Sequence, residues 1–269
     1  MTDKADRVLV KLGGSLVTDK ASAEPRVDSV TVERLAAELA AAEPRPTVLI
    51  HGAGSFGHRI VERTGVHRGL RDDACLLAMG ETQRLQYELD ARLARLLMDA
   101  GLPVMPVQAS SMAVMRDGEL RSLEVSAIRE MVGWGLIPLL YGVPAIDRER
   151  GCSILSGDQL APRIAAALDI PLVIHATDVD GVYEGDPVDK PDARRIDHIH
   201  RGNWAQVRER LAGSHNVDVT GGMGGKIGAL LADAREGQIT RIVDGRIPGR
   251  LTAALSGEPV GTLVSWEEP

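Results

Sequence analysis

Aromatic residues and cysteine are scarce in this chain. Its 269 residues include three Trp, three Tyr and one Phe, which is 3% of the total. The core must therefore be built from aliphatic side chains, and a platform of aromatic rings for stacking nucleic-acid bases is excluded. Cys75 and Cys152 are too few and too far apart for a disulfide framework or a zinc module. We expect both to be buried or idle thiols in a reducing compartment.

Long apolar runs and an excess of positive charge are also absent. No stretch approaches the roughly 18 apolar residues of a membrane span, and residues 1–7 are polar rather than signal-like. We therefore expect a cytoplasmic protein with no membrane partner. The 31 Lys and Arg against 38 Asp and Glu leave a formal charge of −7. This charge argues against nucleic acid as a partner, because phosphate-backbone binding requires a basic face.

Apolar runs of strand length alternate with segments of helical period. This alternation predicts an α/β fold with a mostly parallel sheet covered by helices on both faces. We expect strands over residues 7–10, 47–51, 102–107, 136–141, 172–176, 239–243 and 262–264, and hairpins over 112–120 and 145–155. We expect helices over 32–42, 80–100, 125–134, 158–168, 204–211 and 226–236. No linker divides the chain, so we predict one domain over residues 1–269, with lobes of about 1–150 and 151–269 meeting near residues 142–155.

The glycines gather just beyond expected strand ends, where an open parallel sheet binds its ligands. The first cluster is Lys11-Leu12-Gly13-Gly14-Ser15, with Lys20 nine residues after Lys11. Paired glycines let backbone N–H groups approach phosphate oxygens, and a lysine there supplies a compact positive charge. The alternative for this segment alone is a tight turn with two solvated lysines.

The second cluster, residues 51–58 (HGAGSFGH), contains the pattern G-x-G-x-x-G. A dinucleotide fold needs a helix, a second strand and an acidic residue about 20 residues on, but residues 59–73 contain no apolar run of strand length. A dehydrogenase is therefore disfavoured. What remains is a helix N-terminus whose N–H groups face an anion. His58 is better placed than His51 to donate to a bound phosphate, and a capping or core role is the alternative for either histidine.

The third cluster, residues 219–227 (VTGGMGGKI), is not a Walker A motif. Thr220 stands at the first glycine position and Ile227 at the Ser/Thr position. Lys226, at the start of a helix that follows glycines, can still neutralise nucleotide phosphates. Asp178 and Asp180 follow another strand, where they can border the same nucleotide or cap a turn.

Two further segments carry candidate polar residues. In residues 156–159 (SGDQ), Ser156 or Asp158 can be a helix N-cap, and Asp158 can also hold lysines in place by hydrogen bonds. His198 and His200 lie in a charged stretch that we expect to be exposed. No cysteine or further histidine completes a zinc set with them, so no metal ligands are predicted.

Taken in order, five motifs resemble those of the amino acid kinase superfamily: KLGGS (11–15), HGAGSFGH (51–58), SGD (156–158), ATDVDGVY (176–183) and VTGGMGGK (219–226). Within it the chain is most similar to the isopentenyl phosphate kinase family, through KLGGSLVTDK (11–20) and the histidine that closes the second loop. The match covers about residues 8–264. The resemblance implies ATP-dependent phosphorylation of isopentenyl phosphate with Mg²⁺, on an open αβα sandwich that forms a homodimer.

The resemblance also implies roles for individual residues. The catalytic set is Lys11, Lys20, His58 and Asp158, in which Asp158 orients the two lysines. The ATP site comprises Lys11, Gly13, Gly14, Ser15, Gly54, Asp178, Gly222 and Lys226. The acceptor site comprises Ala53, Gly54, His58 and Gly157, in the N-terminal lobe, while the C-terminal lobe binds the nucleotide.

Two segments depart from the family pattern. Ala53 replaces the usual middle glycine of the second loop, and residues 141–144 (YGVP) stand where the family has His-Gly-Asp. The side chains expected to wall the acceptor's apolar tail, or else to be plain core, are Leu76, Leu77, Met79 and Tyr87. A fosfomycin-type phosphonate kinase of the same superfamily and a non-catalytic nucleotide sensor are the alternative functions.

Overall fold

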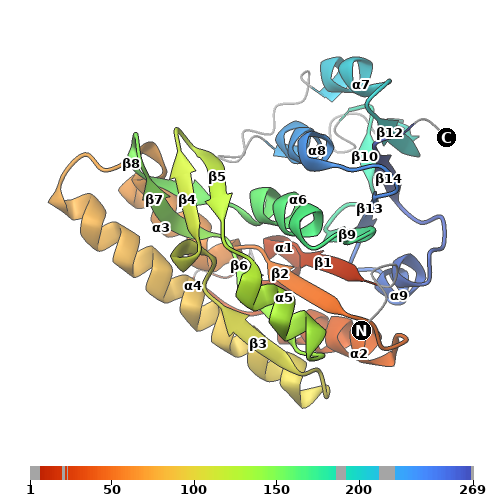
Figure 1. Cartoon of the computed structure of the whole chain (residues 1–269), viewed down its shortest axis with the longest axis horizontal. Coiled ribbons are helices and arrows are strands. Elements are labelled where there is room, and N and C mark those ends of the chain that lie inside the picture. The colour runs from red at the N-terminus through yellow and green to blue at the C-terminus, as the bar shows by residue number, and fades with distance from the viewer. Residues whose placement is uncertain (1–6, 20–21, 23, 186–191, 212–221, 268–269) are drawn as a thin grey trace.

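A computed structural model describes residues 7–19, 22, 24–185, 192–211 and 222–267 (Figure 1). Within them the largest sheet has eight strands in the order β12-β14-β13-β9-β1-β2-β6-β3. Neighbouring strands are parallel except for the pair β13 and β14. In that order the strands are β12 (His198–His200), β14 (Thr262–Ser265), β13 (Ile239–Asp244), β9 (Leu172–Thr177), β1 (Val8–Leu12), β2 (Thr47–His51), β6 (Ile137–Tyr141) and β3 (Val104–Val107). The predicted mostly parallel α/β fold is confirmed.

Strand β1 lies between β9 and β2, and all five of its residues are buried. Successive side chains of a strand point to opposite faces of the sheet. Val8, Val10 and Leu12 join the core on one face, whereas Leu9 joins the core on the other. Lys11 shares the face of Leu9, so the charged residue of this strand points toward helix α6 (Gly157–Ala167).

Helices cover both faces of the sheet (Figure 1). On one face the core joins α1 (Gly14–Val17), α2 (Ser29–Ala41), α3 (Gly54–Thr64), α4 (Asp73–Asp99) and α9 (Arg250–Leu255) to the strands. On the other face α5 (Ser126–Gly133) and α6 pack on the central strands. Helices α7 (Trp204–Leu211) and α8 (Gly222–Asp233) pack at the β13 end of the sheet. The short helices η2 (Val66–Arg68) and η3 (Ala109–Ser111) lie in connections.

Two hairpins form a second sheet in the order β5-β4-β7-β8. The first hairpin joins β4 (Ala113–Arg116) to β5 (Glu119–Leu123), and the second joins β7 (Val143–Asp147) to β8 (Gly151–Leu155). Both hairpins were predicted, and the first turns at Asp117 and Gly118 as expected, with φ of 51° and 81°. A separate pair consists of β10 (Val182–Tyr183) and β11 (Arg195–Ile196).

Two secondary-structure predictions are wrong. The helix predicted over 80–100 begins at Asp73, because the Asp72 side chain caps it by accepting from the backbone N–H of Cys75. The segment with His198 and His200 was expected to be exposed, but it forms β12. It pairs in parallel with β14, which buries Ile199 and His200.

Both cysteines are buried free thiols, as predicted. Burial raises the pKa of the Cys152 thiol to about 11, so this thiol stays protonated and unreactive at neutral pH. Among the helices that the structure describes, none combines the length and the apolar character needed to cross a membrane.

Asp147 ties the two hairpins together. Its buried carboxylate accepts hydrogen bonds from four backbone N–H groups on both turns, those of Asp117, Gly118, Glu149 and Arg150. We expect Asp147→Asn to lower the free energy of unfolding by about 2 kcal/mol, because its Oδ1 keeps three of the bonds but its amide nitrogen cannot accept from the N–H of Gly118, and the charge that strengthens all four is lost. Urea unfolding measures the loss. The control is Asp117→Asn on the same turn, which should change stability by under about 0.5 kcal/mol because Asp117 is exposed.

The same carboxylate makes stability depend on pH. Burial alone raises the pKa of Asp147, but hydrogen bonds from the backbone of Arg150, Gly118 and Glu149 outweigh it, and the pKa lies well below its usual range. Stability from a depressed pKa is complete above the unfolded value of about 3.9 and is lost as pH falls toward the folded value. The wild type should therefore lose more stability than Asp147→Asn between about pH 5 and pH 2, and equal losses would contradict this account.

Candidate active site

Two glycine-rich loops meet at the carboxyl ends of β1 and β2. The first leads into α1 and the second into α3. A Cβ atom placed on Gly14 would lie 2.8 Å from the Cα of Gly54, and one placed on Gly52 would lie 2.9 Å from the Cα of Gly14. No side chain fits in this contact, so glycine is required at these positions. The two clusters predicted to bind phosphates therefore lie side by side.

The hydroxyl group of Thr18 bonds to both loops. It donates to the carbonyl of Gly14 at 2.8 Å and accepts from the N–H of Ser55 at 3.0 Å. Thr18 is buried, so both bonds are shielded from water. The N-cap residue Ala53 offers no side-chain cap to α3, so apart from the N–H of Ser55, which Thr18 binds, the N–H groups of the first turn are available to an anion.

Gly13 anchors the first loop to the neighbouring strand. Its N–H donates to the carbonyl of Ala176 at 2.8 Å. This hydrogen bond fixes the first loop to the end of β9.

Lys11 and Asp158 form an ion pair between β1 and α6, with 2.6 Å between Nζ and Oδ1. The N-cap of α6 is Ser156, whose hydroxyl accepts from the backbone N–H of Gln159 while the Gln159 side chain accepts from the backbone of Ser156. Because Ser156 caps the helix, the Asp158 carboxylate is available to Lys11. A Cβ placed on Gly157 would lie 3.1 Å from Cε of Lys11, so glycine there leaves room for the lysine.

Positive charge surrounds Asp158. Burial alone raises the pKa of its carboxyl, but the ammonium groups of Lys11 and Lys226 outweigh burial, and the pKa falls well below its usual range. Lys226 lies on α8, which packs against α6. At neutral pH the Asp158 carboxylate is therefore ionised, and the structure brings it together with Lys11, Gly157 and Lys226 as predicted.

His175 on β9 completes this group and was missed by the sequence analysis. Its ring is buried, with Nδ1 3.7 Å from Oδ1 of Asp158. Burial and the charge of Lys11 lower the pKa of His175 well below its usual value; Asp158 opposes this effect, and Lys226 adds to it. The ring is therefore neutral at physiological pH.

A buried polar network supports the second loop from behind. His51, the last residue of β2, directs Nε2 toward Oδ1 of Asp90 on α4 at 3.3 Å, and its ring stacks on Tyr141 with 5.2 Å between centroids. Gln86, also on α4, donates from Nε2 to the carbonyl of Ala53 at 3.3 Å. Burial raises the pKa of Asp90, and His51 partly opposes this effect. Tyr141, which departs from the family pattern, thus packs against the histidine that opens the loop.

The sequence analysis also missed Gln86 and Asp90, although a signal for them exists. Gln86, Leu89, Asp90 and Leu93 have the i, i+3, i+4, i+7 spacing of one helix stripe, and all four are buried. Polar residues on a buried stripe indicate partners across the interface. The identity of those partners requires the three-dimensional arrangement of α4 and β2.

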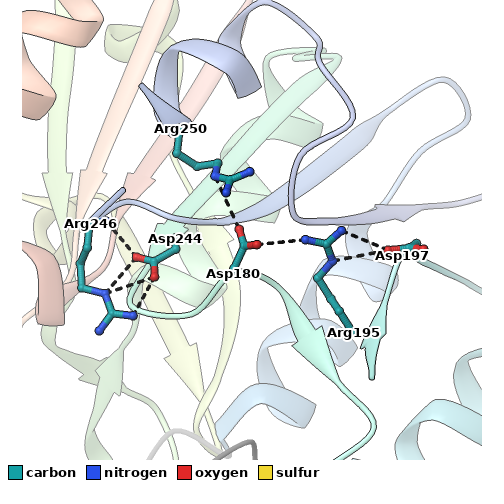
Figure 2. Close-up of polar contacts among 6 residues, drawn as sticks. All are labelled: Asp180, Arg195, Asp197, Asp244, Arg246 and Arg250. Atoms are coloured by element: carbon teal, nitrogen blue, oxygen red, sulfur yellow. Dashed lines mark hydrogen bonds and ion pairs between the residues drawn. The ribbon is translucent and has the colours of Figure 1, made fainter. Parts of the chain in front are cut away.

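Arginines fix the turn that follows β9, as Figure 2 shows. Asp180 pairs with Nη1 of Arg195 at 3.0 Å and with Nε of Arg250 at 3.7 Å. Arg195 also pairs with Asp197 at 3.2 Å. The two partners of Asp180 come from β11 and α9, so Asp180 holds together segments far apart in the sequence.

A second acidic group lies at the end of β13. Asp244 pairs with Nη2 of Arg246 at 2.7 Å (Figure 2). Burial by itself raises the pKa of Asp244, but the hydrogen bonds from Arg246 outweigh it and the pKa is lowered. Asp178 is close enough to raise the pKa of Arg246 as well. Of the two aspartates predicted to border a nucleotide, Asp180 is therefore held in a structural cluster, whereas Asp178 lies near Arg246 at the carboxyl edge of the sheet.

Other predicted site residues lie elsewhere. His58 is exposed on α3, and no described contact joins it to Lys11 or Asp158. Lys20 and residues 219–221 lie outside the described residues, and Gly222 is the first residue of α8. The four side chains expected to wall an apolar tail are not gathered within the described part of the chain. Leu76, Leu77 and Tyr87 are exposed on α4, and Met79 packs with a small cluster that includes Cys152.

A parallel sheet that presents two joined glycine loops and a lysine–aspartate pair at its carboxyl edge is a scaffold for binding and transferring phosphoryl groups. The sequence profile of the amino acid kinase family matches residues 6–244. The chain belongs to this family.

Relatives named isopentenyl phosphate kinase match nearly the whole chain. The protein of that name from Methanothermobacter thermautotrophicus is 36% identical over 96% of this chain and 98% of its own. The one from Methanocaldococcus jannaschii is 30% identical over 97% of this chain and 99% of its own. A solved structure of isopentenyl phosphate kinase superposes with a TM-score of 0.84 at 32% identity, covering 96% of this chain and 100% of that one. The resemblance predicted from the motifs is confirmed.

Thr18 provides a test of the contact between the loops. We expect Thr18→Val to lower the free energy of unfolding by about 1–3 kcal/mol, because it removes both hydrogen bonds and leaves the buried N–H of Ser55 without a partner. Thr18→Ser keeps the hydroxyl and is the control, expected to lose less. Denaturant unfolding of both variants checks this, and a Thr18→Val protein as stable as the wild type would show that the hydroxyl does not hold the loops together.

Proposed function

We propose that this chain transfers the γ-phosphoryl group of ATP to isopentenyl phosphate, giving isopentenyl diphosphate and ADP. The observation that carries the proposal is the Lys11–Asp158 pair beside the two joined glycine loops, and the relatives named isopentenyl phosphate kinase support the choice of acceptor. An oxygen of the acceptor phosphate attacks the γ-phosphorus while the bond to the β–γ bridging oxygen breaks and ADP leaves with the electron pair. The attacking oxygen is already anionic, so no strong general base is needed.

Lys11 and Lys226 hold the phosphates of ATP in this proposal. Asp158 binds Lys11 directly, and the charge of Lys226 lowers the pKa of the same carboxyl, which supports a shared role for the two ammonium groups. Asp158 orients Lys11 and also Lys20, which stabilises the transferring group. The remaining nucleotide contacts come from Gly13, Gly14, Ser15, Gly54, Asp178 and Gly222.

The acceptor phosphate binds at the start of α3. The N-cap residue of this helix, Ala53, provides no side-chain cap, and a helix N-terminus favours an anion. His58 donates to the acceptor phosphate from the same helix. Ala53, Gly54 and Gly157 complete the acceptor site, and Gly157 lies where acceptor and donor phosphates meet.

Mg²⁺ accompanies ATP in this proposal. In residues 7–19, 22, 24–185, 192–211 and 222–267, no three His, Cys, Asp or Glu side chains are placed to hold a metal ion. Mg²⁺ is usually bound through substrate phosphates, water and one or two carboxylates rather than by a protein cage. The site therefore suits a cation carried by the ATP phosphates, where Mg²⁺ neutralises charge on the β- and γ-phosphoryl groups.

We assign the acceptor to an N-terminal lobe of about residues 1–150 and the nucleotide to a C-terminal lobe of about 151–269, within one domain. Support comes from the second loop and its α4 network in the first lobe and from Asp158, Asp178 and Lys226 in the second. A cytoplasmic location agrees with two cysteines that are both free thiols.

We propose a homodimer formed through the exposed face of α4. Leu77 and Tyr87 are 79% and 60% exposed on this helix. Tyr87 and Ala91 also line an open, largely apolar groove of about 670 Å³ between α4 and the start of α2, and exposed apolar patches mark interaction sites.

Light scattering should give twice the chain mass of 28.8 kDa. Tyr87→Glu should shift the mass toward the monomer, and a wild type that is monomeric at micromolar concentration would contradict the proposal.

An assay of ADP release from Mg-ATP tests the reaction. We expect turnover with isopentenyl phosphate and slower turnover with fosfomycin, because the relatives support a phosphate acceptor. A preference for fosfomycin would identify a phosphonate kinase instead. The absence of ADP release with every small phosphate, phosphonate and carboxylate tried would indicate a nucleotide sensor.

The His58→Ala variant tests the acceptor site. Loss of one donor to a charged group in the transition state costs about 10²- to 10³-fold in kcat, so we expect most turnover to be lost while calorimetry shows ATP binding unchanged. His67→Ala, which removes the histidine of η2, is the control and should keep near-normal turnover. A His58→Ala enzyme with near-normal kcat would remove this histidine from the mechanism.

A further inference from the structure

His175 is a polar residue in an apolar setting. It lies on β9 among the buried residues Val173, Ile174 and Ala176, and it is 1% exposed. Within the residues that the structure describes, neither ring nitrogen has a hydrogen-bond partner. A buried polar group without a partner costs about 1–3 kcal/mol. Packing of β9 alone would favour an aliphatic residue, so the imidazole needs another explanation.

The register of the sheet places His175 beside the catalytic lysine. Ile50, Lys11, His175 and Ile242 face one another across β2, β1, β9 and β13. Residues in such a row point to the same face of the sheet, and Lys11 points to α6. The Nδ1 atom of His175 therefore lies beneath the Asp158 carboxylate, 3.7 Å from the same oxygen, Oδ1, that binds Lys11.

Oδ1 of Asp158 accepts a hydrogen bond from Nζ of Lys11 at 2.6 Å. In the proposed reaction, on which this inference rests, Lys11 also binds the phosphates of ATP, so part of its hydrogen bonding leaves Asp158. A carboxylate at the base of α6 then needs another donor, because an ionised group without one is costly to keep away from water. His175 can supply one from the sheet side, since its Nδ1 lies 3.7 Å from Oδ1 and a neutral imidazole carries a single N–H.

We propose that His175 is a positioning residue, whose Nδ1–H donates to Oδ1 of Asp158 and holds the carboxylate when Lys11 turns to the phosphates. A movement of about 0.8 Å brings the two atoms to an ordinary N–H···O distance of about 2.9 Å. Asp158 then keeps its orientation and continues to direct the lysines. His175 does not touch the substrates; it acts through Asp158.

Two substitutions separate this role from simple packing. His175→Leu keeps an apolar side chain of similar size and removes the N–H, whereas His175→Asn places an amide N–H near the position of Nδ1. We expect His175→Leu to lower kcat about 10- to 100-fold, the effect of losing a hydrogen bond to a charged group. The KM for isopentenyl phosphate should stay within about 2-fold, because the acceptor site is untouched. His175→Asn should retain kcat within about 3-fold.

His200→Leu is the matched control, because His200 is also a buried strand histidine but lies on β12, away from the site. Its kcat should match the wild type. Thermal unfolding of all three variants, carried out alongside, shows which kinetic losses accompany loss of fold. A folded His175→Leu enzyme with wild-type kcat would overturn the proposal, and so would equal losses of kcat in the folded Leu and Asn variants.

A second measurement does not require the acceptor. Nitrogen-15 NMR of the wild type with labelled histidine reports which ring nitrogen of His175 carries the proton, with and without a non-hydrolysable ATP analogue. We expect the Nδ1–H tautomer in both states; an Nε2–H tautomer would overturn the proposal. If the wild type fails to phosphorylate isopentenyl phosphate, the proposed function fails, while the NMR result still decides the role of His175.

Discussion

The contact between the two glycine loops sets the position of most groups in the site. Gly14, Gly52 and Gly54 let the backbone at the end of β1 pass against the backbone at the start of α3 with no side chain between them. The Thr18 hydroxyl bonds to both loops across this contact. Because β1 and β2 are neighbours in the sheet, the lysine of one strand and the helix N-terminus that follows the other lie at the same edge of the sheet. A side chain at any of these glycines would separate them.

The charged groups near the end of β1 are arranged around one carboxylate, that of Asp158. Asp158 binds Lys11 and is influenced by Lys226, and the neutral ring of His175 lies beneath it. Buried ion pairs are weak contributors to stability because desolvation offsets their attraction, and an unpartnered imidazole is costly as well. Neither the Lys11–Asp158 pair nor the His175 ring is therefore explained by stability. Their position together on an otherwise aliphatic sheet is best explained by a role in the proposed reaction. Asp180, Asp244 and their arginines form a different kind of cluster, which fixes the turns that follow β9 and β13 (Figure 2).

The sequence predicted those parts of the molecule that depend on interactions between residues close together in the chain. Apolar strands, glycines after strand ends and the cap at Ser156 each follow from residues close together in the chain, and so do both hairpins. Lys11 and Asp158 were paired through the resemblance of five ordered motifs. His175 and Asp90 were missed because their partners lie on other elements, far away in the sequence. His175 is placed beside Lys11 by the strand register, and Asp90 is placed near His51 by the packing of α4. The start of α4 was placed at residue 80, whereas the cap at Asp72 lies well before it.

The place of β1 in the sheet also has a consequence for synthesis of the chain. One edge of β1 pairs with β2, as in Val8 with Thr47, but the other edge pairs with β9, as in Val8 with Leu172. While the ribosome is still translating the middle of the chain, β1 and β2 can pair, but the second edge of β1 has no partner. An unpaired edge in a largely apolar strand is a template for aggregation. A chain whose synthesis stops before β9 would expose this edge of β1. A chaperone that covers β1 until β9 has been synthesised would therefore raise the yield of folded protein.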